Sequence, residues 1–193
     1  LPSGRMMEAM EDDLVVGTLG AWAATLEAVG DWQAMDSDRF EVLTPAGLFG
    51  KTTSKSPFLG MLMGLQYQGH VMRDGEPVTM PNSLPEKPRL DFDIPIVLIF
   101  GTSMSAGKTL SGRTIIYLLS QTGLKVVGAK LTGAARYRYV LSYADAGASA
   151  VFDFVDAGLA STVCDVETYR SSLDYLLSRI AETTPDVVVA EAG

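Results

Sequence analysis

The sequence predicts an α/β protein in which a parallel sheet covered by helices follows a small β-rich or α+β module. Three observations predict it. Strand-like and helix-like segments alternate from residue 94 onward, prolines concentrate between residues 81 and 93, and acidic residues concentrate before them. We therefore expect an N-terminal module (residues 1–80), a proline-rich linker (residues 81–93) and an α/β unit (residues 94–193).

The N-terminal module begins with a segment that is compatible with a helix. Residues 13–29 are apolar at helical spacing, and Gly30 is a suitable stop. Residues 40–43 and 65–80 favour strands, and Asp74-Gly75 suits a tight hairpin turn in the second of them.

A second glycine-lysine-threonine sequence lies within this module. Residues 50–56 (G-K-T-T-S-K-S) have the composition of a phosphate-binding loop, but no strongly apolar strand precedes them and no convincing helix follows. This context favours a polar surface loop over a ligand site.

The α/β unit has a regular alternation of elements. Short apolar runs favour buried strands, and apolar residues at helical spacing favour helices between them; Gly123 is placed to end the first helix. Strands separated by helices predict a parallel sheet with helices on its faces. The expected strands are residues 94–100, 124–129 and 187–190, and the expected helices are residues 107–121 and 166–181.

Composition excludes several classes of protein. No apolar run approaches the roughly 20 residues of a membrane helix, so no membrane partner is expected. A pI of about 4.6 argues against a nucleic-acid partner. The single cysteine excludes an internal disulfide and favours a cytoplasmic location. Residues 101–144 carry six basic residues and no acidic one, which favours a small phosphorylated ligand.

A candidate phosphate loop lies between the first strand and the first helix of this unit. Residues 101–109 read G-T-S-M-S-A-G-K-T, with the first glycine one place earlier than in the usual Walker A pattern. Small residues let backbone N–H groups surround a phosphate, and the helix presents its positive end to it. The expected nucleotide-binding residues are Thr102, Ser103, Met104, Ser105, Ala106, Gly107, Lys108 and Thr109.

Side chains around this loop complete the expected site. Lys108 is expected to stabilise charge on the terminal phosphates, and the Thr109 hydroxyl to bind Mg²⁺. Glu191 follows the last strand and is a second expected Mg²⁺ ligand, directly or through water; a solvated carboxylate is the alternative. Lys130 and Arg136 are the expected substrate-binding residues, so that Lys108, Lys130 and Arg136 form the catalytic set.

Other charged residues leave two interpretations open. Arg138 suits either an anion clamp or a solvated helix face. Asp145, Asp153 and Asp156 suit either a role in orienting a substrate amine or water, or ordinary exposed loop positions.

The loop resembles that of a known group of enzymes. The spacing G-T-S-x-x-A-G-K-T is similar to the phosphate loop of dethiobiotin synthetase and its relatives, in the class of P-loop proteins that includes nitrogenase-iron-protein-like ATPases. Residues 129–133 (A-K-L-T-G) and residues 187–193, a strand ending in an acid, resemble two further segments of those enzymes. The resemblance implies a P-loop NTPase fold and an enzyme that uses Mg-ATP to activate a carboxylate or carbamate by phosphoryl transfer.

A second resemblance covers residues 94–193. Residues 128–133 and 153–158 are similar to an uncharacterised P-loop family often labelled epimerase/dehydratase-like, some of whose members are proposed amino-acid N-acetyltransferases. It implies an alternative in which the loop holds the diphosphate of acetyl coenzyme A. A non-enzymatic nucleotide-dependent switch is a third interpretation.

The end of the chain adds one expectation. Gly193 falls in the middle of the expected nucleotide site, so we expect the α/β unit to be truncated, with its C-terminal part missing. Substrate, base preference and assembly as a homo-oligomer stay open.

Overall fold

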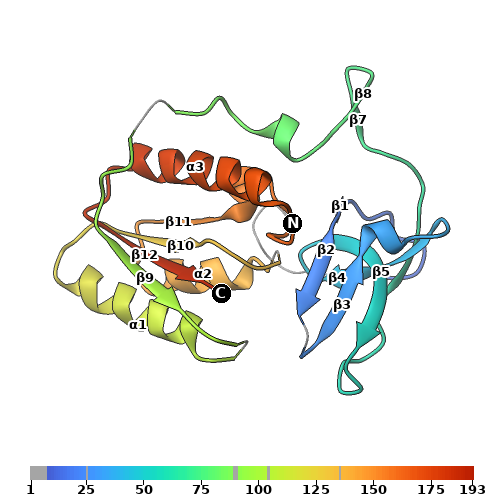
Figure 1. Ribbon diagram of the computed structural model, residues 1–193, viewed down its shortest axis with the longest axis horizontal. Coiled ribbons are helices and arrows are strands. Elements are labelled where there is room, and N and C mark those ends of the chain that lie inside the picture. The colour runs from blue at the N-terminus through green and yellow to red at the C-terminus, as the bar shows by residue number, and fades with distance from the viewer. Residues whose placement is uncertain (1–7, 25, 89–90, 104, 135) are drawn as a thin grey trace.

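The computed structural model describes residues 8–24, 26–88, 91–103, 105–134 and 136–193. Figure 1 shows a sheet flanked by helices beside a second sheet that belongs to the N-terminal module. None of the described helices is long and apolar enough to cross a membrane.

The α/β unit contains the expected parallel sheet. Its strand order is β11-β10-β12-β9, and all neighbouring strands run in parallel. The elements are β9 (Ile96–Phe100), α1 (Lys108–Gln121), β10 (Val126–Lys130), α2 (Arg138–Asp145), β11 (Ala150–Asp153), the 3₁₀ turn η3 (Phe154–Ala157), α3 (Val166–Glu182) and β12 (Val187–Ala192). The prediction of a parallel sheet covered by helices is confirmed, whereas α2, β11 and η3 were not predicted.

Helices cover both faces of this sheet. Val188 and Ala190 of β12 pack on the α3 side with Leu176 and Ile180, whereas alternate residues of the same strand face α1 and α2. Strands that are buried on both faces are continuously apolar, which explains the run of three valines in β12.

Topology brings two distant segments together. The connection from β9 through α1 leads to β10, and β12 occupies the position between these two strands. Since parallel strands end at the same edge, the loop after β9 and the end of β12 are neighbours. In Figure 1 the arrowheads of β9 and β12 point toward the N-terminal module.

The N-terminal module is β-rich. Five strands pair in the order β2-β3-β5-β4-β6, and β1 pairs with β5. The elements are β1 (Thr18–Leu19), β2 (Ala21–Ala24), β3 (Ala28–Asp31), the 3₁₀ turn η1 (Trp32–Ala34), β4 (Arg39–Thr44), β5 (Leu48–Lys55) and β6 (Gly64–Gln66). The strand expected at residues 40–43 is confirmed within β4.

The helix expected at residues 13–29 is wrong, because the described part of this segment forms β1, β2 and the start of β3. Trp22 and Ala24 are buried two residues apart, which is the period of a strand. A Cβ built at Gly17 would lie 2.3 Å from the Phe49 ring, and one at Gly20 would lie 2.5 Å from Leu48, so both glycines allow β5 to approach. The surface loop expected at residues 50–56 is also wrong, since β5 extends through Lys55.

A separate hairpin follows the module's sheet. β7 (Met72–Arg73) pairs antiparallel with β8 (Glu76–Pro77), which confirms the expected turn. Asp74 and Gly75 both have positive φ, 53° and 86°, as a tight hairpin turn requires.

The proline-rich segment is attached to α3. It begins with the 3₁₀ turn η2 (Pro81–Ser83), and the Tyr175 hydroxyl donates to the Pro85 carbonyl at 3.2 Å. Lys87 forms an ion pair with Asp174 of the same helix, and Leu84 packs against the α3 core.

Candidate functional site

The candidate phosphate loop joins β9 to the start of α1. Ser105 and Gly107 have positive φ, 62° and 84°, so the chain turns sharply before Lys108. Among the described residues, no side chain caps the start of α1. The first N–H groups of a helix have no partner within it, so this end can accept an anion. Thr102, Ser103, Ser105 and Ala106 are exposed around it. The Met104 prediction lies outside the described residues.

Lys108 folds back across the loop. Its Nζ donates to the Ser103 carbonyl at 2.9 Å. A Cβ built at Gly101 would lie 2.7 Å from Lys108 Cδ, so the lysine stem lies directly over that glycine. Any larger residue at position 101 would occupy the space of the Lys108 side chain.

Thr109 connects the loop to the neighbouring strand. Its hydroxyl donates to Glu191 Oε2 at 2.9 Å. Glu191 is near the carboxyl end of β12 and is only 3% exposed. The two residues expected to bind Mg²⁺ are thus in direct contact.

Two more donors hold the Glu191 carboxylate. Lys130 Nζ donates to Oε1 at 2.7 Å, and the Tyr143 hydroxyl donates to Oε2 at 2.6 Å. Lys130 and Glu191 are opposite each other in the β10–β12 register, which brings their side chains to the same face of the sheet. We call Thr109, Lys130, Tyr143 and Glu191 the carboxylate network.

The network sets the charge state of its members. Burial raises the pKa of Glu191, but the hydrogen bonds from Lys130, Tyr143 and Thr109 outweigh it, so the pKa lies below its usual value. Burial, with the Glu191 charge beside it, raises the pKa of Tyr143 far above its usual value. Glu191 is therefore ionised at neutral pH, and Tyr143 stays a hydrogen-bond donor.

Tyr143 was not predicted as a site residue. It occupies a slot between α1 and β10: a Cβ at Gly112 would lie 2.8 Å from its hydroxyl, and a Cβ at Gly128 would lie 2.9 Å from its own Cβ. The signal in the sequence is Gly112 itself, because a glycine inside a helix is unfavourable unless another group packs closely against it.

Of the two arginines after β10, Arg136 meets the N-terminal module. Arg136 forms an ion pair with Glu27 and lies over the Trp22 ring at 5.3 Å from its centroid. Arg138 is exposed and lies over the Tyr139 ring. The substrate-binding role of Arg136 stays a prediction; in this structure its guanidinium connects the two units.

The aspartates divide between structural and exposed positions. Asp153 accepts from Val155 N–H, and Asp156 accepts from Asp153 N–H, so they cap η3 together. Burial, with the Asp156 charge adding to it, raises the pKa of Asp153 to about 6. Asp145 is exposed at the end of α2.

No protein-family model matches the chain, and no curated protein matches it. The resemblances drawn from the loop and strand motifs therefore stay predictions, and the function is argued from the geometry of the site.

Proposed function

We propose that this chain is a P-loop nucleotide-binding protein that holds Mg-ATP at residues 101–109. One observation carries the proposal: Lys108 and Thr109 begin an uncapped helix after a sharp turn, and Thr109 contacts the buried carboxylate of Glu191 on the adjacent strand. A helix start without a cap, a lysine and a hydroxyl next to a fixed carboxylate are what a nucleoside triphosphate with Mg²⁺ requires.

The residues fit a magnesium ion. The Thr109 hydroxyl donates its hydrogen to Glu191 Oε2 at 2.9 Å, which leaves its oxygen lone pairs for a metal ion. Mg²⁺ takes its remaining ligands from phosphate and water, and it neutralises phosphate charge when bound. Thr109 would hold it directly, and Glu191, whose Oε2 already accepts two hydrogen bonds, would hold it through water.

The other site residues would act on the phosphates, on Glu191 and on the substrate. Lys108 has to leave the Ser103 carbonyl before its ammonium can reach a phosphate, and the exposed loop around it leaves room for that movement. Lys130 keeps Glu191 ionised and fixes its orientation. We propose an ATP-dependent enzyme that activates a carboxylate or carbamate by phosphoryl transfer, with Arg136 at the edge where its substrate would enter.

Calorimetry tests the binding proposal. Mg-ATP should bind the full chain, and chelation of the metal should weaken binding at least tenfold. Lys108→Ala should abolish detectable binding, because it removes the only cation of the loop. Arg113→Ala is the matched control: Arg113 is exposed on the same helix, and its loss should leave affinity unchanged.

Other results would replace the proposal. Metal-independent binding of acetyl coenzyme A in preference to ATP would favour the N-acetyltransferase alternative. Mg-ATP binding without turnover of any carboxylate or carbamate substrate would favour a nucleotide-dependent switch. Equal affinity in wild type and Lys108→Ala would overturn the phosphate loop itself.

A further inference from the structure

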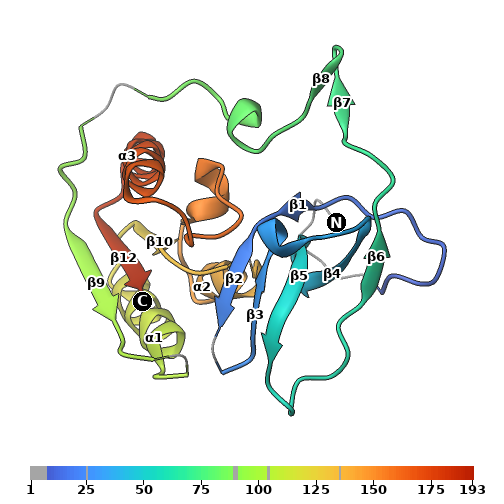
Figure 2. The same ribbon diagram turned by 45° about the vertical axis from the view of Figure 1, so that its right-hand side comes forward.

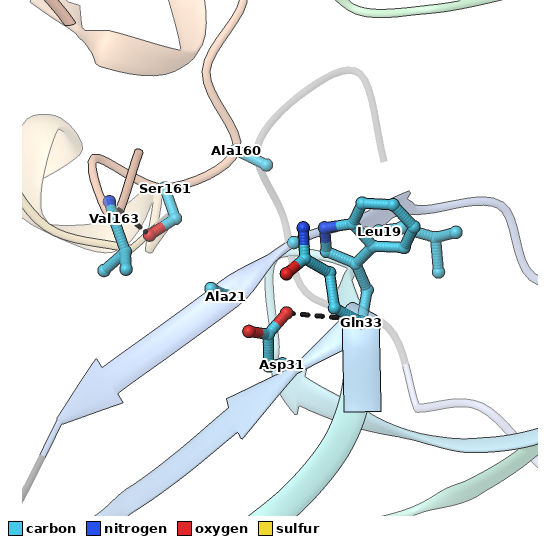
Figure 3. A pocket seen from close by; sticks show the side chains of 9 residues that line it. Leu19, Ala21, Asp31, Gln33, Ala160, Ser161 and Val163 are labelled. Carbon is cyan, nitrogen blue, oxygen red and sulfur yellow. Dashed lines mark hydrogen bonds between the residues drawn. The ribbon is translucent and has the colours of Figure 1, made fainter. Parts of the chain in front are cut away.

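A cavity of about 210 Å³ lies between the N-terminal module and the α/β unit. From the module it is lined by Asp31, Trp32 and Gln33, and from the segment after η3 by Ala160, Ser161 and Val163. Figure 3 shows Asp31 and Gln33 on one side of this space and Ser161 and Val163 on the other. We call it the seam pocket.

The wall of the α/β unit is anchored to the end of β10. Thr162 N–H donates to the Gly133 carbonyl, and Gly133 N–H donates to the Thr162 hydroxyl, both at 2.9 Å. Ser161 is buried, and its hydroxyl oxygen accepts from Val163 N–H. This wall is therefore part of the folded edge of the sheet, and the pocket is preformed on that side.

Among the described residues that line the pocket, one side chain is titratable. It is Asp31, which carries a negative charge when ionised. One Asp31 oxygen accepts from Gln33 N–H at 2.9 Å, which leaves the second oxygen for another donor. Across the parts of the chain that the structure describes, no lysine or arginine lies within ion-pair distance of Asp31.

The cation paired with Asp31 in the sheet register is engaged elsewhere. Lys51 is opposite Asp31 in the β3–β5 register, yet its ammonium pairs with Asp36 at 2.7 Å. The N-terminal module carries eleven acidic and five basic residues, so its field also favours a positive ligand. Asp31 thus faces the pocket as a carboxylate with no lysine or arginine of the described residues beside it.

Neighbouring groups suit an organic cation better than a metal ion. Trp32 lines the pocket beside Asp31, and an indole is the side chain that attracts organic cations most strongly. The Gln33 amide and the Ser161 hydroxyl add neutral hydrogen-bonding groups. Sites for drug-sized ligands occupy about 300–1,000 Å³, so this smaller cavity suits a ligand of a few non-hydrogen atoms.

We propose that the seam pocket binds a small primary ammonium or guanidinium compound, with Asp31 as its counter-ion. The inference does not depend on the phosphate loop. It adds a second ligand site, at the junction of the two units.

Calorimetry without nucleotide tests it. Putrescine and agmatine should bind the full chain, and butane-1,4-diol, which matches putrescine in length but carries no charge, should not. Nα-acetyl-lysine N-methylamide, whose ε-ammonium is free, represents a lysine side chain in a peptide. It should bind more weakly than putrescine if the natural ligand is a free small molecule, and more tightly than putrescine if the natural ligand is a peptide lysine.

A pair of variants locates the site. Asp31→Asn keeps an oxygen acceptor for Gln33 N–H and should weaken binding of both amines at least tenfold. Asp38→Asn removes the same charge from an exposed position outside the pocket and should change nothing. Because Lys108→Ala should not alter amine binding, failure of this inference can be distinguished from failure of the ATP proposal.

A measurement on the wild type needs no variant. Saturation with putrescine should shift the Trp32 indole N–H resonance in a ¹⁵N-edited spectrum, while butane-1,4-diol leaves it in place. Absence of saturable binding by either amine, an unmoved Trp32 signal, or equal weakening by Asp31→Asn and Asp38→Asn overturns the proposal.

Discussion

The two sheets hold their ion pairs in opposite environments. In the α/β unit Lys130 and Glu191 form a pair whose side chains are 11% and 3% exposed, whereas in the module Lys51 and Asp36 form a pair at 37% and 72% exposure. Water solvates the second pair whether or not the chain is folded. The first pair has lost its water and depends on its partners, so the charge of the candidate site is coupled to the stability of the unit that carries it.

The largest effect is expected from breaking the buried pair. Glu191→Gln leaves the Lys130 ammonium buried without a counter-ion and should lower the free energy of unfolding by about 3–5 kcal/mol. Urea denaturation measures it. Asp36→Asn breaks the exposed pair and should have no measurable effect. The added substitution Lys130→Met should restore much of the loss; no recovery in the double variant would mean that Lys130 is not the cause.

The buried Asp153 should make stability depend on pH in a range where the two ion pairs do not titrate. The pKa of Asp153 is raised to about 6, so the folded state holds its proton more tightly than the unfolded state does. Its stabilising contribution is complete below pH 4 and is lost as the pH rises through 6. Asp153→Asn should therefore match wild type at pH 4 and exceed its stability at pH 7 by up to about 3 kcal/mol. A constant difference between pH 4 and 7 would contradict the assignment.

The slot of Tyr143 offers a sharper test of packing around the network. Alanine in place of glycine normally stabilises a helix by about 1 kcal/mol. Gly112→Ala should instead cost about 1–3 kcal/mol, because the new Cβ meets the Tyr143 hydroxyl. In a Tyr143→Phe background the cost should shrink, since the closest atom is gone. Thermal unfolding of the wild type, the two single variants and the double variant gives the coupling energy between positions 112 and 143. Additive effects of the two substitutions would mean that Tyr143 does not pack against Gly112.

The smallest effect is expected where the two units meet. Glu27 and Arg136 form a partly exposed pair, with side chains 32% and 17% exposed. Glu27→Gln should lower stability by less than about 1 kcal/mol. Limited proteolysis of the proline-rich segment should become faster if the pair also holds the units together. Unchanged proteolysis would assign that role to apolar contacts such as those of Ala134 and Ala160.

The sequence predicted helices and strands correctly where the spacing of apolar residues agrees with their burial in the structure. The apolar run before Glu191 and the leucines of α3 predicted their elements, and the turn before Lys108 was identified by its small residues. Residues 13–29 were ambiguous, because alanines and glycines fit a helical period and a strand period equally. In the folded chain Phe49 and Leu48 of β5 fill the space that a Cβ at Gly17 or Gly20 would need, a contact that no local pattern contains.

The candidate site was predicted residue by residue but not as a network. Thr109, Lys130 and Glu191 each follow from a local motif, yet their contacts depend on β12 lying between β9 and β10. Tyr143 is 48 positions from Glu191 in the chain, and α2 has only eight residues, which is too short for a helical period to be read from the sequence. Register and helix docking are properties of the assembled sheet, so no local pattern contains them.

The junction between the units has a consequence for biosynthesis. Figure 2 shows β2 and β3 beside the segment that follows η3, and this segment is translated about 130 residues after Asp31. At 5–20 residues per second, the finished N-terminal strands wait on the order of ten seconds for the surface that covers them. During that interval the apolar rim around Trp22 is open to chaperones, and a ribosome stalled near α2 would present it to the cell unprotected.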